Sequence, residues 1–174
     1  PILSAAAVGK SPVSATEQLD FNCFYPTGLP GANSVVSCGG LFVACTAASS
    51  SPDFATSPDG KVWTLRTTAD GNSKSIACDG IGVVVAKRTT STGEIWVSAN
   101  NGVTWAKKTN MPGSALDNSV PAIHNGIILI QASTANTLYR STDYGTTWTT
   151  VSVPFATSYA YPIVAVAGRF VVPA

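Results

Sequence analysis

The chain has 174 residues, enough for one domain with a substantial core. Its net charge is +1 and only 11% of its residues are charged, so no strong field exists to attract nucleic acid or an acidic membrane. The longest apolar runs, such as IILIQA at 127–132, are too short to cross a bilayer. We therefore expect neither nucleic-acid binding nor membrane insertion.

From the N-terminus onward, four apolar stretches are each interrupted by a tight pair of residues. Their turn glycines, Gly40, Gly80, Gly126 and Gly168, are spaced by 40, 46 and 42 residues. Gly-Gly, Asp-Gly and Asn-Gly accept positive φ at both central positions of a two-residue hairpin, and Ala-Gly does so less well. The apolar run after each turn is continuous, which predicts strands buried on both faces. The four stretches are SVVSCGGLFVAC, SIACDGIGVVVA, AIHNGIILIQA and IVAVAGRFVVPA.

A second phrase follows each of the first three stretches: SPDGKVW at 57–63, SANNGVTW at 98–105 and STDYGTTW at 141–148. The serines are 41 and 43 residues apart and the tryptophans 42 and 43, so two residue types report one period. We expect a second hairpin turn here. Its Asp or Asn would accept backbone N–H bonds, its Gly would supply positive φ, and its Trp would cover a neighbour. The residues concerned are Ser57, Asp59, Gly60, Trp63, Ser98, Asn100, Gly102, Trp105, Ser141, Asp143, Gly145 and Trp148.

These turns resemble the Asp-box, or BNR repeat, Ser-x-Asp-x-Gly-x-Thr-Trp. The third turn matches fully, the second has Asn100 for Asp, and the first is one residue shorter. The resemblance is to BNR-repeat β-propellers, which include sialidases and many non-enzymatic proteins. It implies an all-β fold of four-stranded antiparallel blades, and it is specific for fold rather than for function.

Four short strands in about 42 residues is the repeat length of a propeller blade. We predict a half-blade at 1–33, complete blades at about 34–74, 75–118 and 119–154, and a half-blade at 155–174. The first half-blade rests on SATEQLDF at 14–21, which aligns with SANNGVTW but lacks the Asp and Gly. Unpaired half-blades would expose sheet edges. We therefore expect a partner, either a second copy or the rest of a larger propeller, rather than a four-bladed ring closed by this chain alone.

Asp143 could be a catalytic carboxylate, a metal ligand or a residue that holds a turn. Asn100 occupies the same position, and an amide cannot serve as a nucleophile or general base, so we favour the turn. A sialidase would need an arginine triad, an Arg-Ile-Pro phrase and paired acids, and a glycosidase needs two facing carboxylates. The sequence offers no such set, so we predict no catalytic residues and no cofactor. The available residues are Arg66, Arg88, Arg140, Arg169, Glu17 and Glu94.

The cysteines Cys23, Cys38, Cys45 and Cys78 form no C-x-x-C pair, so no metal site is predicted. In the first hairpin, Cys45 should face Ser34, too far along the strands for Cys38 to reach. Cys38 and Cys78 share one place in successive blades, where small buried thiols pack well. We expect all four to be reduced.

His124 has the same place as Cys38 and Cys78 in the next blade, and we expect a structural role for it. The only basic cluster, Lys107-Lys108, is expected to be solvated.

Two classes of function remain. The favoured one is a non-enzymatic structural or binding propeller, and the alternative is a glycan-binding or glycan-hydrolysing propeller whose active-site residues lie outside this segment. The polar surface comes mainly from Ser, Thr, Asn and Gln, which is common in extracellular and virion β-proteins. This make-up resembles bacteriophage tail and tail-fibre proteins that carry BNR repeats. The partners it implies are other virion proteins and, on a host surface, a glycan.

Overall fold

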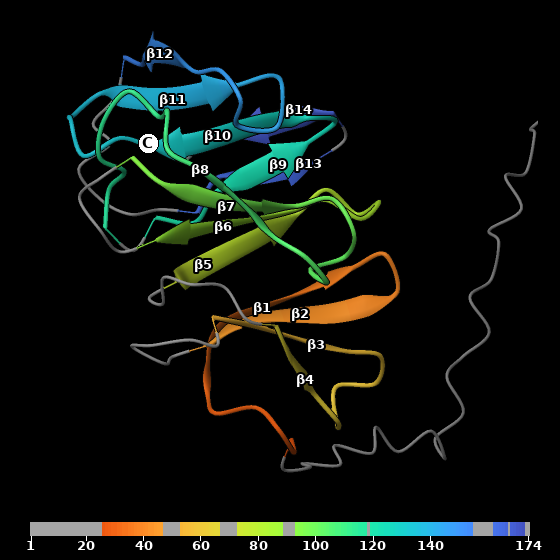
Figure 1. Ribbon diagram of the computed structural model, residues 1–174. Coiled ribbons are helices and arrows are strands. Elements are labelled where there is room, and N and C mark those ends of the chain that lie inside the picture. Colours follow the sequence, from red (N-terminus) through yellow and green to blue (C-terminus); the bar gives the residue numbers. More distant parts are fainter. Residues whose placement is uncertain are drawn as a thin grey trace, which may run out of the picture.

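The computed structural model describes residues 26–46, 53–66, 73–88, 93–117, 119–154, 162–166 and 168–172. Within these ranges the chain forms fourteen strands and no helix, which confirms the predicted all-β class (Figure 1). The strands make three four-stranded antiparallel sheets and one strand pair. No described segment is a helix of the length and apolarity that a membrane span requires.

Each sheet is a meander in which neighbouring strands follow one another in the chain. The first sheet contains β1 (Ala32–Cys38), β2 (Leu41–Thr46), β3 (Phe54–Ser57) and β4 (Thr64–Arg66). The second contains β5 (Ser73–Cys78), β6 (Val84–Arg88), β7 (Ile95–Ser98) and β8 (Ala106–Lys108). The third contains β9 (Ala122–His124), β10 (Ile127–Gln131), β11 (Thr137–Ser141) and β12 (Thr149–Ser152). The pair is β13 (Val164–Val166) and β14 (Arg169–Val171).

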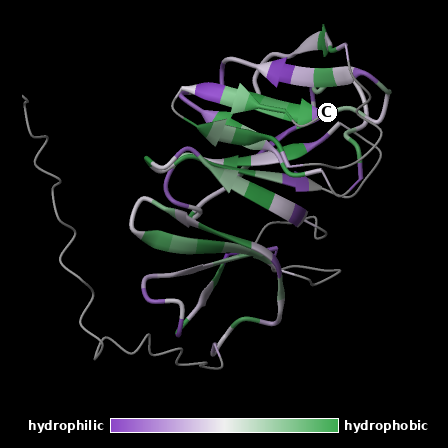
Figure 2. Ribbon diagram, turned by 180° about the vertical axis from the view of Figure 1, so that it is seen from behind, coloured by the Kyte–Doolittle hydropathy of each residue, from purple (hydrophilic) through white to green (hydrophobic). Residues whose placement is uncertain are grey.

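The sheets lie face to face in chain order, as Figure 1 shows. The first strand of each unit contacts the first strand of the next, β1 with β5, β5 with β9, and β9 with β13, so these four strands form the inner edge of the stack. The outer strands β4, β8 and β12 carry mostly exposed or half-buried side chains. Figure 2 shows the apolar residues concentrated on the strands and much of the polar colour on the turns.

The core lies between the sheets. Val84 and Ala86 of β6 pack with Val43 and Phe54 of the first sheet. Val85, between them in the sequence, packs on the other side against the third sheet. Successive residues of a strand point to opposite faces, so a strand with a sheet on either side needs an unbroken apolar run. This explains the continuous runs of β6 and β10. In β2, the face turned away from the second sheet is covered by Trp63 of its own sheet, which packs with Ala44.

Strand β14 departs from the expectation that every such run is buried on both faces. Phe170 packs against the third sheet, but Val171 is 56% exposed. Among the described residues, no further strand covers its other face. The prediction of two buried faces is therefore wrong for this strand as the structure has it.

Two of the predicted two-residue turns are confirmed. Cys38 pairs with Leu41 across Gly39-Gly40, and His124 pairs with Ile127 across Asn125-Gly126, with positive φ at all four turn residues. In the fourth hairpin, Val166 pairs with Arg169, and Ala167 lies outside the described residues.

The Asp-Gly turn does not follow this prediction. Cys78 pairs with Val84, which leaves a five-residue loop at 79–83. The Asp79 carboxylate accounts for the wider loop. Its Oδ1 accepts hydrogen bonds from the N–H groups of Ile81, Gly82 and Val83 at 2.9, 3.1 and 3.0 Å. A side chain that satisfies three successive backbone donors competes with the tighter turn.

The cysteines also differ from expectation. Cys38 and Cys78 form a disulfide with a Cα–Cα distance of 5.8 Å, so the prediction that both are reduced is wrong. They hold equivalent places on β1 and β5, and these inner strands are direct neighbours. Cys45 is free, pairs with Ser34 as predicted, and has its pKa raised to about 12 by burial. Cys23 lies outside the described residues.

Candidate functional site

The phrase at 141–148 forms a turn that its own side chains hold together. Ser141 Oγ accepts hydrogen bonds from the N–H groups of Asp143 and Gly145 at 3.3 and 2.8 Å and donates to Asp143 Oδ1 at 2.8 Å. Asp143 Oδ1 accepts from the N–H groups of Thr146 and Thr147 at 3.1 and 2.8 Å, and Oδ2 accepts from Thr147 Oγ1 at 2.7 Å. The Asp143 pKa is lowered to about 2, and the hydrogen bonds from Thr147 are the largest cause.

The other two turns repeat this arrangement. Asn100 Oδ1 accepts from Thr104 N–H at 2.8 Å, and its Nδ2 donates to Thr104 Oγ1 at 2.9 Å. The amide thus repeats the contacts of Asp143 with Thr147, with the hydroxyl bond reversed, while Val103 N–H donates to the Asn100 backbone carbonyl. Asp59 Oδ1 accepts from the N–H groups of Lys61 and Val62, which lowers its pKa. We call 57–63, 98–105 and 141–148 the serine turns. Their hydrogen bonds are the ones that a turn-holding role requires.

The tryptophans of the serine turns have two functions that can be separated. Each indole Nε1 donates to the turn glycine carbonyl, at 2.8 Å for Trp63, 2.9 Å for Trp105 and 3.2 Å for Trp148. The rings then cover apolar surface. Trp105 stacks on Phe54 of the first sheet, with ring centroids 3.7 Å apart and an interplanar angle of 13°. The second serine turn therefore attaches the second sheet to the first.

Replacing Asp143 tests the turn-holding role. Asp143→Ala should lower the melting temperature by about 5 °C, because two backbone donors and two hydroxyls lose their acceptor. Asp143→Asn should lower it by no more than about 2 °C, because Asn100 makes the equivalent contacts. Thermal melts of the two variants give the answer, and equal damage by Ala and Asn would show that the charge matters rather than the turn.

The same variants have a pH signature. The folded pKa of Asp143 lies below its ordinary value of 3.8, so the carboxylate stabilises the fold above that value and loses its effect as the pH falls through about 2. The difference between wild type and Asp143→Asn should therefore shrink in this acidic window.

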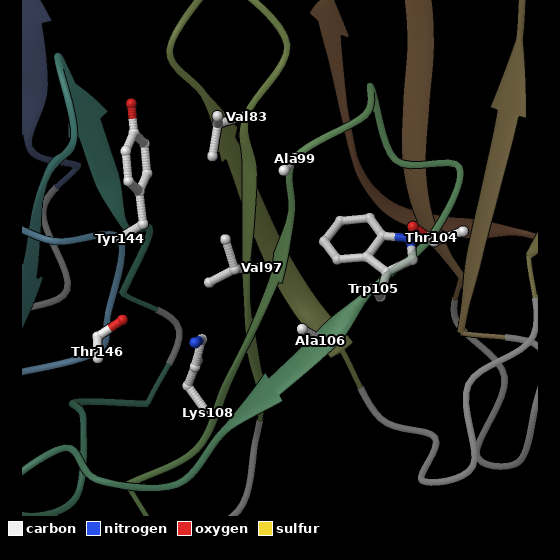
Figure 3. Close-up of a pocket in the computed structure, with 9 residues that line it drawn as sticks. All are labelled: Val83, Val97, Ala99, Thr104, Trp105, Ala106, Lys108, Tyr144 and Thr146. Carbon is white, nitrogen blue, oxygen red and sulfur yellow. The ribbon is translucent and has the colours of Figure 1, made fainter.

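A cavity of about 440 Å³ opens between the second and third sheets, on the side of the serine turns (Figure 3). The second sheet supplies most of its wall. From the third sheet, Tyr144 and Thr146 of the last serine turn face this wall across the opening. We call it the inter-sheet cavity. Its lining residues are Val83, Val97, Ala99, Thr104, Trp105, Ala106, Lys108, Tyr144 and Thr146.

Tyr144 is fixed at the rim of this cavity. Its backbone has a φ of +54°, its N–H donates to the Gly126 carbonyl at 3.3 Å, and its ring lies beside the Gly126 Cα. The side chain nevertheless stays 37% exposed. Asn101, at the same place in the second serine turn, has a φ of +56°. The backbone conformation thus belongs to the turn, whereas the ring is particular to the third sheet.

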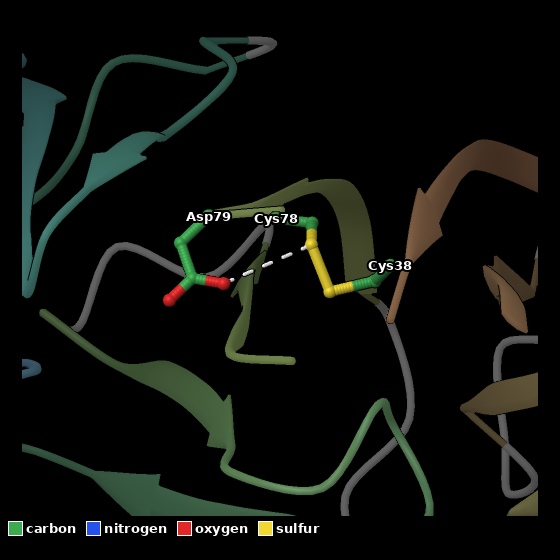
Figure 4. Close-up of side chains that lie close together, drawn as sticks. All are labelled: Cys38, Cys78 and Asp79. Carbon is green, nitrogen blue, oxygen red and sulfur yellow. Dashed lines mark hydrogen bonds between the residues drawn. A yellow bond between two sulfur atoms is a disulfide. The ribbon is translucent and has the colours of Figure 1, made fainter. Parts of the chain in front are cut away.

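A second cavity, of about 410 Å³, lies along the inner edge of the stack, and we call it the inner-strand cavity. Side chains or backbone of β1, β5, β9 and β13 line it, together with two ionisable residues, Asp79 and His124. His124 is half-buried at the end of β9. Beside the cavity, the ligand atoms of Cys38, Cys78 and Asp79 lie within 4.8 Å of one another (Figure 4).

Several charged side chains bond to a charged or polar group beside them. Lys107 is exposed on β8, as expected, and lies 3.1 Å from Glu94. Lys108 is half-buried and lines the inter-sheet cavity. Lys87 is buried, donates to the Leu116 carbonyl and to Ser119 Oγ, and has its pKa lowered to about 8 by burial. Arg66 Nε donates to Thr56 Oγ1.

The sequence pointed to the serine turns but missed the two cavities. Tyr144 and Lys108 occupy variable positions of the repeat, and the Asp-Gly pair at 79–80 predicts only an ordinary two-residue turn. The one available signal was that Cys38, Cys78 and His124 share a repeat position, which places them in a row along the inner strands.

The sequence matches no family model and no curated protein. The structure is similar to that of an ancestral GH74 enzyme, with a TM-score of 0.51 and 16% identity over 71% of this chain. The chain has the fold of a β-propeller. We therefore call the three four-stranded sheets the first, second and third blades.

Two structures of YCF48 are also similar. One is bound to a D1 peptide (TM-score 0.47, 17% identity, 68% of this chain) and one is from Cyanidioschyzon merolae (TM-score 0.48, 19% identity, 73% of this chain). This chain spans 19% of the GH74 enzyme chain and 39% and 41% of the two YCF48 chains. At these identities the likeness concerns the fold alone.

Proposed function

We propose that this chain is a non-enzymatic binding propeller that holds a surface glycan in the inter-sheet cavity. The observation that carries the proposal is the composition of that cavity. Its size of about 440 Å³ falls within the usual range for ligand sites, and apolar walls are combined with a few polar groups. Blades that served only to pack against one another would leave no cavity of this size between them.

The lining suits a saccharide. A sugar ring has an apolar face of C–H groups and an edge of hydroxyl groups. The exposed ring of Tyr144 offers a flat surface for the face. Thr104 and Thr146 can donate to and accept from the hydroxyls, and the Lys108 ammonium can donate to a hydroxyl or pair with an acidic sugar.

The carboxylates support binding rather than hydrolysis. Glycosidases use two carboxyl groups that face each other across the scissile bond. Here Asp59 and Asp143 accept backbone hydrogen bonds within their turns, and Glu94 pairs with Lys107. Asp79 lies on the inner-strand cavity rather than on the inter-sheet cavity. These carboxylates thus make other contacts and do not face each other across the inter-sheet cavity.

The proposed setting is a bacteriophage tail or another virion component that contacts a host surface. The low charge and the richness in Ser and Thr support it, and so does the Cys38–Cys78 disulfide, because disulfides persist mainly in extracellular and virion environments. Other virion proteins, a second copy of the chain or the rest of a larger propeller would be its protein partners. Neighbouring genes that encode no virion components would argue against this setting.

A glycan array, followed by titration calorimetry on the best ligand, tests the binding. Tyr144→Asn should lower the affinity at least about tenfold, equivalent to about 1.4 kcal/mol, because it removes the ring while keeping a residue that the second serine turn tolerates at this φ. Lys108→Ala should weaken acidic glycans most.

The control is Val62→Ala, which shortens an exposed apolar side chain of the first serine turn, outside the cavity lining. It should leave affinity unchanged. The proposal fails if the array shows no bound glycan, or if a bound glycan is unaffected by both cavity variants.

A further inference from the structure

We propose that a second copy of the chain docks on the strand pair of β13 and β14. Residues 11–24 of the second copy add the two missing strands of a fourth blade, and its first blade packs on the exposed face of that blade. This association makes specific one of the protein partners named above, and it does not depend on glycan binding.

The strand pair has an open edge and an open face. In each of the three blades the second strand, β2, β6 or β10, pairs with a neighbour on both edges. Strand β14 holds the same place but, within the described part of the chain, pairs with β13 alone. On the face turned away from the third blade, Val164, Val166 and Val171 are 48, 55 and 56% exposed. An open strand edge beside an apolar face is a site for adding a strand.

The N-terminal segment carries the half-blade that the strand pair lacks. Ser14 and Phe21 align with the serine and the tryptophan of the second serine turn. By this alignment, residues 11–14 correspond to the third strand of a blade and residues 22–24 to the outer strand. Both stretches lie outside the described residues, so their place is inferred from the segment that follows them.

That segment is fixed along the first serine turn. Thr27 N–H donates to the Lys61 carbonyl at 2.8 Å, and Trp63 N–H donates to the Thr27 carbonyl at 3.0 Å. Leu29, two residues further on, packs against the apolar cluster that contains Trp63. The chain ahead of Thr27 therefore arrives at the first blade beside the turn that joins β3 to β4.

The linker before the third blade does the same. Asn110 Nδ2 donates to the carbonyl of Thr146, which directly follows its turn glycine as Lys61 does. Asn110 comes five residues after the tryptophan of the preceding serine turn, and Thr27 comes six residues after Phe21. The hydrogen bonds of the linker and the alignment of the sequence thus agree that an outer strand precedes Thr27, as β8 precedes Asn110.

The three blades also predict the register of the added strand. In the first and third blades, the residue three positions after the inner turn glycine pairs with the residue just before the serine of the serine turn. These pairs are Val43 with Thr56 and Leu129 with Arg140. Val171 comes three positions after Gly168, so it should pair with Val13. Pro12 removes one N–H from the added strand, which therefore makes one ladder bond fewer.

The first blade offers the complementary face. Val35, Phe42 and Leu65 are 47, 39 and 44% exposed on the side turned away from the second blade. Consecutive blades bury such faces against each other, yet this face and the face of the strand pair are exposed at once, so they do not meet within one chain. In two copies they can meet reciprocally, closing a ring of the size that propellers have. A net charge of only +1 opposes this association weakly.

Cross-linking of the full-length chain tests the association. One protein carries Val13→Cys and the other Val171→Cys, both with Cys23→Ser, and the two are mixed in urea without reductant, refolded together and mildly oxidised. We expect a covalent dimer with one chain of each kind, because opposed residues of neighbouring strands are close enough for a disulfide. Light scattering of the unmodified chain should give twice the mass of one chain.

Val103→Cys in place of Val171→Cys is the matched control, because Val103 is an exposed valine of the second serine turn, away from the strand pair. It should give at least about tenfold less covalent dimer. A single chain with both Val13→Cys and Val171→Cys detects closure by its own N-terminal segment, and a bond within a monomer would overturn the proposal. A monomeric unmodified chain would also overturn it, as would a dimer without the bond between positions 13 and 171. None of these outcomes involves a glycan, so they leave the glycan proposal to its own test.

Discussion

Loss of the Cys38–Cys78 disulfide should lower the free energy of unfolding by about 4 kcal/mol. The bond joins residues 40 positions apart. In the chain-entropy account, closing a loop of this length removes many conformations from the unfolded state. The bond also links β1 and β5, which share the core between the first two blades. Unfolding of this interface is therefore opposed by a covalent link.

Urea unfolding of oxidised wild type and of the Cys38→Ala/Cys78→Ala variant measures this effect. Dithiothreitol added to the double variant provides the control, because it should cause no further loss. If dithiothreitol destabilises the variant as much as wild type, the redox-sensitive element lies elsewhere, for example at Cys23. If the variant is as stable as oxidised wild type, the disulfide has no stabilising role.

The disulfide shows what the repeat could and could not predict. The period correctly placed Cys38 and Cys78 at equivalent positions, and the hairpin register correctly placed Cys45 opposite Ser34. Equivalence in sequence, however, says nothing about how closely two blades approach or which side chains meet. The 5.8 Å between the Cα atoms depends on packing of the inner strands, which the period does not encode.

The candidate sites divide in the same way. The hydrogen bonds of the serine turns are local, within a few residues, so residue type and spacing were enough to predict their kind. The Asp79 loop was missed because Asp-Gly favours two alternatives, a tight turn and a wider loop closed by the carboxylate. The inter-sheet cavity was missed because Tyr144 and Lys108 come from different blades.

Phe54→Ala should be the most damaging single core substitution, lowering stability by about 3–5 kcal/mol. The side chain is fully buried in β3 and stacks on Trp105 of the second blade. Its removal loses the free energy gained by burying the apolar ring, and it leaves a cavity at the blade interface. Phe42→Ala is the matched control, because Phe42 belongs to the same blade but is 39% exposed. Denaturant unfolding should show a loss several-fold smaller for Phe42→Ala, and equal losses would contradict the interface account.

A double-mutant cycle with Trp105→Ala then isolates the stack itself. Stacked aromatic pairs contribute about 0.5–1.5 kcal/mol beyond the area they bury, and residues in contact show such coupling whereas distant residues do not. Phe54 and Trp105 should therefore couple by about 1 kcal/mol, and Phe42 and Trp105 should be additive. Trp105 is also anchored to its own turn by the bond from its Nε1 to Gly102 O. Coupling across the interface would thus show that Trp105, which this bond holds to its own serine turn, attaches one blade to the blade before it.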